Sequence, residues 1–249
     1  MSHSQNNFLS RIPEDWLLTR GKNVKVGVCD TGCDLSHKAL QKTNIEHESF
    51  GGGANKSHGT QIAGIIVGNP DDIYTFQSMS PLSNMFFADI QTKGDLAYKS
   101  FRQALEWIIE SKVDVLNLSF AYPNDNEEIK KLLIDISKNT LIFCAYSPIL
   151  EFPHSYDEVI SVGMSDEPVN IITDGECFST GLNNKYSKVR GTSFSTALMS
   201  SVGCLAKSYD KEIDKEKFLL TVKGNKKMEK IKDRNIISSP LKQVNLSFD

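Results

Sequence analysis

Short apolar runs and amphipathic helical patterns alternate along the chain, and this alternation constrains the fold more than any other feature. The apolar runs have the length of strands and lie at residues 24–29, 85–90, 113–118, 140–145 and 159–163. Helical patterns at residues 95–110 and 127–137 lie between them. Strands that alternate with helices form right-handed βαβ crossovers. The sequence therefore predicts an α/β fold with a mainly parallel central sheet and helices on both faces.

Length and composition favour one compact unit. Hydrophobic residues make up 39% and charged residues 24% of the 249 positions, which is enough apolar mass for a sizeable core. Because no linker or internal repeat divides the chain, we expect a single domain over residues 1–249. The N-terminal residues lack the pattern of a secretory signal, and no run approaches the ~18 apolar residues of a membrane span. We therefore expect a cytoplasmic protein without a membrane partner.

Charge and cysteine content narrow the function classes further. The 28 basic and 31 acidic residues give a net charge of −3. The chain therefore lacks the excess of basic residues that is typical of nucleic-acid-binding proteins. The cysteines are odd in number, spread out and mostly set in apolar runs: Cys29, Cys33, Cys144, Cys177 and Cys204. This usage favours free thiols in a reducing compartment over a disulfide scaffold.

Three short motifs stand apart from the framework of strands and helices: Asp30-Thr31-Gly32, Ser57-His58-Gly59-Thr60 and Gly191-Thr192-Ser193. Acyl transfer by serine needs a hydroxyl nucleophile, an imidazole that takes and returns its proton, and a carboxylate that orients the imidazole. The motifs supply these groups as Ser193, His58 and Asp30. Singly, each residue fits a turn or a helix cap, but the joint pattern predicts a catalytic triad.

Each triad candidate also stands where its role requires. Asp30 ends a buried strand, at the sheet edge where α/β folds place their ligand sites. His58 opens an apolar helical run that would fix its backbone. Ser193 begins a helical pattern at residues 193–206 that is small or apolar almost all round. The first amides of such a helix can stabilise an oxyanion formed at Ser193.

With these motifs in this order, the chain resembles the subtilisin-like serine proteases, or subtilases. Lesser landmarks are the segments Asp34-Leu35-Ser36-His37, Asn117-Leu118-Ser119 and Glu158-Val159-Ile160-Ser161-Val162-Gly163. The resemblance implies a subtilisin-like three-layer fold and a serine endopeptidase that works through an acyl-enzyme. It also implies an extended peptide partner, added as a strand beside Ser119. The residues that correspond to the substrate-binding segments are Ser119, Phe120, Ala121 and Tyr146.

The chain departs from the family at the oxyanion site. An asparagine side chain normally supplies the second oxyanion donor, and Ser147 stands in its place. Loss of this donor in subtilisin costs about 10²–10³ in turnover, which slows an enzyme without abolishing its activity. Ser147 with its shorter hydroxyl and Thr192 beside the nucleophile are our candidates for the missing donor.

A second departure concerns the pocket for the residue before the cut. Tyr146 and Ala121 replace glycines that usually line this pocket. Because larger walls leave less room, we expect a preference for Gly or Ala before the cleaved bond.

The first strand of the catalytic domain is predicted to begin at residue 24, so we expect no propeptide. We therefore expect a minimal intracellular form that processes one dedicated substrate, such as a leader-bearing peptide. We expect no cofactor. Asp71 and Asp72 are the only hint of a calcium site in the sequence, and two adjacent carboxylates are weak evidence for one. A metal site at Cys29, Cys33 and His37 is disfavoured because these residues interleave with the catalytic strand.

Two other readings stay open. A subtilase-fold module could bind peptides in the same groove without useful turnover, as a pseudoprotease weakened by loss of the oxyanion asparagine. An esterase or acyltransferase could use the same triad, although no residue argues for it. The mixed charges from Lys207 onward predict solvated peripheral helix and loops.

Overall fold

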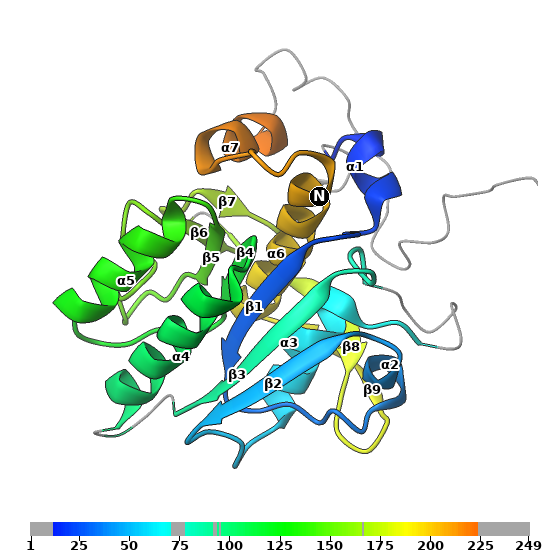
Figure 1. Ribbon diagram of the computed structural model, residues 1–249, viewed down its shortest axis with the longest axis horizontal. Helices are drawn as coiled ribbons and strands as arrows, with labels where there is room; N and C mark the ends of the chain where they lie inside the picture. The colour runs from blue at the N-terminus through cyan, green and yellow to red at the C-terminus, as the bar shows by residue number, and fades with distance from the viewer. Residues whose placement is uncertain (1–11, 71–77, 92–93, 95, 166, 224–249) are drawn as a thin grey trace, which may run out of the picture.

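A seven-stranded parallel sheet forms the centre of the molecule (Figure 1). The computed structural model describes residues 12–70, 78–91, 94, 96–165 and 167–223. In spatial order the strands are β2 (Ile45–Phe50), β3 (Asn84–Ile90), β1 (Lys25–Asp30), β4 (Val115–Leu118), β5 (Leu141–Ala145), β6 (Ile160–Gly163) and β7 (Ile171–Ile172). Every neighbouring pair is parallel. The predicted parallel α/β sheet is confirmed.

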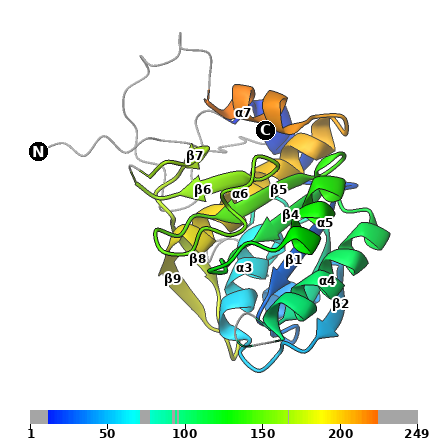
Figure 2. The ribbon, with the colours of Figure 1, turned by 90° about the vertical axis from the view of Figure 1, so that its left-hand side faces the viewer.

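Helices cover both faces of the sheet, as Figures 1 and 2 show. On one face, α4 (Ala97–Ser111) and α5 (Glu127–Ser137) share an apolar cluster with the strands. On the other face lie α3 (Ser57–Val67) and α6 (Thr192–Tyr209), which belong to a second apolar cluster. This gives the three-layer arrangement that the sequence predicted, with the sheet as the buried middle layer.

The strands and helices that the apolar periodicity predicts are all present, within a few residues at each end. The helix α5, for example, begins after Asn126, whose side-chain oxygen accepts hydrogen bonds from the amides of Glu128 and Ile129, both at 3.1 Å. The short helix α2 (Lys38–Gln41) begins after His37 in the same way, with the imidazole as the acceptor. These caps fix where the chain turns from loop into helix.

Three features of the sheets were not predicted from the sequence. The edge strand β2 is largely exposed, so it lacks the apolar run of a central strand. The two-residue strand β7 is too short to show a pattern. An antiparallel hairpin of β8 (Glu176–Thr180) and β9 (Tyr186–Arg190) carries mixed polar and apolar residues and packs against α3.

The prediction of a solvated tail from Lys207 onward is wrong for part of that segment. Lys207 is buried in α6, and its ammonium group donates to the carbonyl oxygens of Asn139 and Lys211 at 2.8 and 3.0 Å. The helix α7 (Lys215–Lys223) buries Phe218 against α1 (Glu14–Thr19), the N-terminal helix, and against β5. A lysine can lie in the interior when its stem packs and its charge finds acceptors, which charge counting along the sequence misses.

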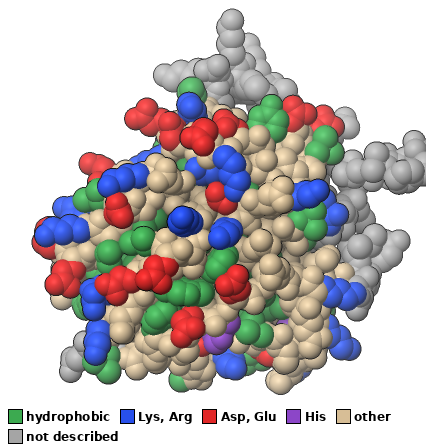
Figure 3. Space-filling view, viewed as in Figure 1, with side chains coloured by type: hydrophobic (Ala, Val, Ile, Leu, Met, Phe, Trp, Pro, Cys, Tyr) green, Lys and Arg blue, Asp and Glu red, His purple; other side chains and the backbone are tan. Residues whose placement is uncertain are grey.

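The surface carries both signs of charge. On the face seen in Figure 3, acidic and basic side chains are interspersed and form no large patch of one sign. No helix in the described part of the chain is both long and apolar enough to cross a membrane. All five cysteines are free thiols, as their spacing predicted.

Candidate active site

Asp30 is the last residue of β1 and lies at the carboxyl edge of the sheet. Its side chain is 2% exposed, and Thr31 donates to its Oδ1 atom from both the backbone amide (2.7 Å) and the hydroxyl (3.2 Å). The Nδ1 atom of His58 lies 2.9 Å from both carboxylate oxygens. The structure thus brings together two of the three predicted triad residues in direct contact, 28 positions apart in the chain.

Close packing of the first turn of α3 carries His58 to this position. At Gly59, an added Cβ atom would lie 2.2 Å from the carbonyl oxygen of Gly32, so only glycine lets the helix approach the loop after β1 this closely. From the other side, the hydroxyl of Thr180 donates to the carbonyl of Thr60 at 2.6 Å. The loop and the hairpin therefore hold α3 from two directions.

The environment of His58 favours its charged form. Burial alone would lower the pKa of the imidazole, but the hydrogen bond and the negative charge of Asp30 raise it, and the net shift is upward. The fold holds this proton more tightly than the unfolded chain does. The group therefore stabilises the folded state below about pH 6.5, and this contribution is lost as the pH rises through the raised pKa.

A pH profile of peptide cleavage tests this environment. A base must be neutral to accept the serine proton, so activity is expected to fall on acidification with a midpoint above the reference value of about 6.5. The profile of kcat/KM for a small peptide substrate reports the free enzyme. A midpoint at or below the reference value would contradict the net upward shift of the His58 pKa.

Ser193 is the second residue of α6 and lies at the same edge of the sheet, against the residue that follows β4. Its hydroxyl donates to the carbonyl oxygen of Ser119 at 3.0 Å. The ring of Phe194 lies 5.7 Å from the imidazole of His58, so the start of α6 adjoins the Asp30–His58 pair. For attack on a substrate, the hydroxyl must turn from Ser119 toward His58, and such contacts often form only with substrate bound.

The two candidate oxyanion donors differ in their surroundings. The Oγ atom of Ser147 accepts hydrogen bonds from the amides of Leu150 (3.1 Å) and Ile149 (3.4 Å). These bonds use its lone pairs and leave its proton free to donate. Thr192 is half-buried as the first residue of α6.

The predicted substrate-binding residues fall on two neighbouring segments, after β4 and after β5. Ser119 is buried, and the ring of Phe120 packs edge-on against Phe101 at 5.0 Å. Farther along, Tyr122 and Phe152 form a bridge between the two segments, with backbone hydrogen bonds of 2.7 and 3.2 Å. The bridge therefore joins the two segments through their backbones.

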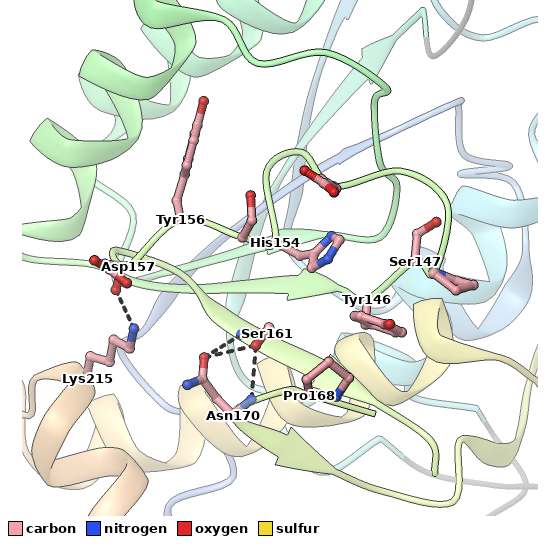
Figure 4. Close-up of a pocket in the computed structure, with 12 residues that line it drawn as sticks. Tyr146, Ser147, His154, Tyr156, Asp157, Ser161, Pro168, Asn170 and Lys215 are labelled. Carbon is pink, nitrogen blue, oxygen red and sulfur yellow. Dashed lines mark hydrogen bonds between the residues drawn. The ribbon is translucent and has the colours of Figure 1, made fainter. Parts of the chain in front are cut away.

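A cavity of about 390 Å³ opens beside the end of β5 (Figure 4). Its lining is mainly polar and consists of Tyr146, Ser147, Pro148, Glu151, His154, Ser155, Tyr156, Asp157, Ser161, Pro168, Asn170 and Lys215. Tyr146 packs edge-on against His154, with ring centroids 5.0 Å apart. Most of this lining was not predicted, because the residues come from loops without a recognisable motif.

The structure argues against the alternative metal site at Cys29, Cys33 and His37. The Nδ1 atom of His37 accepts from the amide of Ala39, and its Nε2 atom donates to the carbonyl of Lys185, both at 3.1 Å. With both nitrogens engaged, His37 has none left for a metal. Burial also raises the pKa of the Cys33 thiol to about 12, which disfavours the thiolate that metals bind.

Within the described residues, no three His, Cys, Asp or Glu side chains are grouped to hold a metal ion. Asp71 and Asp72, the weak calcium signal, lie outside the described residues. The expectation that no cofactor is needed stays a prediction.

One buried polar residue of the site was noted in the sequence only as a landmark. Asn117 interrupts the apolar strand β4, and its Nδ2 atom donates to the hydroxyl of Ser119, which in turn donates to the carbonyl of Ser193. An amide in an otherwise apolar run is the signal that could have identified it.

Comparisons with known proteins identify the family of the chain. The structure is similar to that of the prenylagaramide maturation protease PagA, with a TM-score of 0.66 at 21% identity over 82% of this chain and 80% of that one. The major intracellular serine protease of Bacillus subtilis (strain 168) is 30% identical, over 81% of this chain and 74% of its own length. The intracellular serine protease of Paenibacillus polymyxa is 29% identical, over 79% and 70%. A family model described as the subtilase family matches residues 21–227. The chain therefore belongs to the subtilase family and is a subtilisin-like serine endopeptidase.

Proposed function

We propose that the endopeptidase acts through Ser193 as nucleophile, His58 as general base and Asp30 as the carboxylate that orients it. The observation that carries this assignment is the hydrogen bond from His58 Nδ1 to Asp30, made at the same sheet edge as Ser193, the second residue of α6. This bond fixes the tautomer in which Nδ1 is protonated and Nε2 carries the lone pair.

The chemistry then follows in two steps. The Oγ atom of Ser193 attacks the peptide carbonyl while His58 Nε2 accepts the proton of the Ser193 hydroxyl. His58 then donates this proton to the leaving amine. Water attacks the resulting acyl-enzyme with His58 again as base. The peptide lies extended beside the segment that follows β4, held through backbone hydrogen bonds.

Labelling with a fluorophosphonate probe tests the assignment. The wild-type chain is expected to react, and Ser193→Ala is expected not to. Ser208→Ala, at the far end of the same helix, is the matched control and should label as the wild type does. Labelling that survives in Ser193→Ala would overturn the assignment of the nucleophile.

The same samples separate the alternative functions. A peptide-binding pseudoprotease would bind extended peptides without Ser193-dependent labelling, as expected if the loss of the oxyanion asparagine had ended turnover. An esterase or acyltransferase would label but leave peptides intact. Labelling together with cleavage of a peptide supports the endopeptidase with this triad.

We propose that Ser147 supplies an oxyanion donor, because its proton is free while its lone pairs are engaged. Ser147→Ala is expected to lower kcat about 10²-fold, near the lower end of the effect of such a donor. Ser147→Asn keeps an acceptor for the two amides and adds a longer donor, so it should raise kcat above the wild type. Equal kcat values for all three proteins would exclude Ser147 and leave Thr192 as the candidate.

We also propose a small residue, Gly or Ala, before the cleaved bond. Tyr146, braced by His154, and Ala121 stand where glycines leave room in relatives. A peptide panel is expected to give higher kcat/KM with Gly or Ala than with Phe or Leu. Tyr146→Gly should shift the preference toward larger residues, whereas the exposed Tyr209→Ala should not. Best cleavage after Phe or Leu by the wild type would contradict this proposal.

A dedicated processing role fits the similarity of fold to a maturation protease. We propose a leader-bearing peptide as substrate, without a nucleic-acid or membrane partner and without a cofactor. The names of the intracellular relatives support work inside the cell. We expect the enzyme to cleave such a precursor at one bond. An unfolded general protein substrate should stay largely intact under the same conditions.

A further inference from the structure

A chain of buried hydrogen bonds links the interior of the sheet to Ser193. Asn117, in the middle of β4, is fully buried. Its Nδ2 atom donates to Ser119 Oγ at 3.0 Å, and its Oδ1 atom accepts from Ser200 Oγ at 3.0 Å. Ser200 follows Ser193 by seven residues, which places both on the same face of α6. Asn117 is therefore hydrogen-bonded both to the segment after β4 and to α6, the two segments that meet at the proposed nucleophile.

Ser119 and Ser193 exchange a pair of hydrogen bonds. The hydroxyl of Ser119 donates to the backbone carbonyl of Ser193 at 2.9 Å, and the hydroxyl of Ser193 donates to the backbone carbonyl of Ser119 at 3.0 Å. The first of these bonds holds the backbone of Ser193 and does not involve its side chain. The backbone can thus stay in place when the Ser193 hydroxyl turns away from Ser119 toward His58.

Asn117 determines which way the proton of Ser119 points. A serine hydroxyl has one proton to donate. Asn117 Nδ2 donates to Ser119 Oγ at 3.0 Å, and Asn117 Oδ1 is a more distant acceptor for the Ser119 proton (3.4 Å) than the carbonyl of Ser193 (2.9 Å). The proton is therefore directed to the carbonyl of Ser193. An aliphatic residue would fill this strand position without the cost of burying an amide. The amide needs a reason beyond packing, and its hydrogen bond to Ser119 supplies one.

We propose that Asn117 is a positioning residue, which acts through the Ser119 hydroxyl to hold the backbone of Ser193 in the geometry for attack. This inference rests on the proposed function, since it takes Ser193 as the nucleophile. It predicts a defect in turnover and not in peptide binding, because the Ser119 carbonyl remains available to the substrate in every variant below.

A double-mutant cycle tests the proposal. Asn117→Ala and Ser119→Ala are each expected to lower kcat about tenfold, the effect of one hydrogen bond, with little change in KM. Because both act through one bond to Ser193, the double variant should lose no more than the worse single variant. Losses that multiply to about a hundredfold would show independent roles and overturn the proposal.

Ser201→Ala is the matched control for structural damage. Ser201 is an equally buried serine of α6, but its hydroxyl bonds to the carbonyls of Ile65 and Ala197, outside this chain of bonds. It should lower the melting temperature and leave kcat unchanged. If Asn117→Ala does not fold, Ser119→Ala alone decides: unchanged kcat in that variant overturns the proposal. The assignment of Ser193 then still stands on its own labelling test, so the two failures are distinguishable.

Discussion

His58→Ala is expected to lower kcat for a peptide substrate about 10⁶-fold, the loss found when the base of the subtilisin triad is removed alone. The reason is that no other group then accepts the proton of Ser193. In the structure, the imidazole lies beside Phe194 at the start of α6 and is fixed by Asp30 on its other side. Steady-state kinetics of wild-type and variant chains give the measurement.

His47→Gln provides the control for this loss. His47 is an exposed histidine of β2 that pairs with Asp89, the sheet neighbour of Asp30, at 2.9 Å, and its replacement leaves Asp30, His58 and Ser193 unchanged. The control should retain cleavage near the wild-type level. Retention of activity by His58→Ala itself would mean that another group serves as base and would contradict the proposed triad.

Asp30→Asn is expected to lower kcat about 10⁴-fold with the fold intact. The surroundings of Asp30 give the reason. Because the amide and hydroxyl of Thr31 both donate to Oδ1, an asparagine would keep its oxygen there and turn its NH₂ group toward His58. The imidazole would then accept at Nδ1 and carry its proton on Nε2, the tautomer that cannot take a proton from Ser193.

The same variant moves the acidic limb of the pH profile. Asp30 raises the pKa of His58 against the opposing effect of burial, so its removal leaves burial alone and shifts the midpoint to lower pH. Asp34→Asn, four residues later and outside the triad, should leave both kcat and the midpoint unchanged. A midpoint that does not move in Asp30→Asn would show that another group raises the His58 pKa.

Local sequence patterns predicted much of this fold. The strands β4 and β5 bury every side chain, so the runs at residues 113–118 and 140–145 are mostly apolar. Such runs can be recognised as strands from the sequence alone. The edge strand β2 escaped prediction because only part of it is covered. The helix α7 looks like a solvated segment until Phe218 meets Trp16 and Phe143, residues more than seventy positions away.

The amino-acid sequence was enough to predict the central strands and main helices, the family resemblance and the three residues of the proposed triad. These depend on residue type and spacing, which are local properties of a chain. The folded structure was needed to show that Asp30 contacts His58, that Ser193 donates to Ser119, and that Asn117 is hydrogen-bonded to both Ser119 and Ser200. Such contacts join residues far apart in the chain, and a hydrogen bond depends on ångström-scale distances that only the packing of the sheet against α3 and α6 sets.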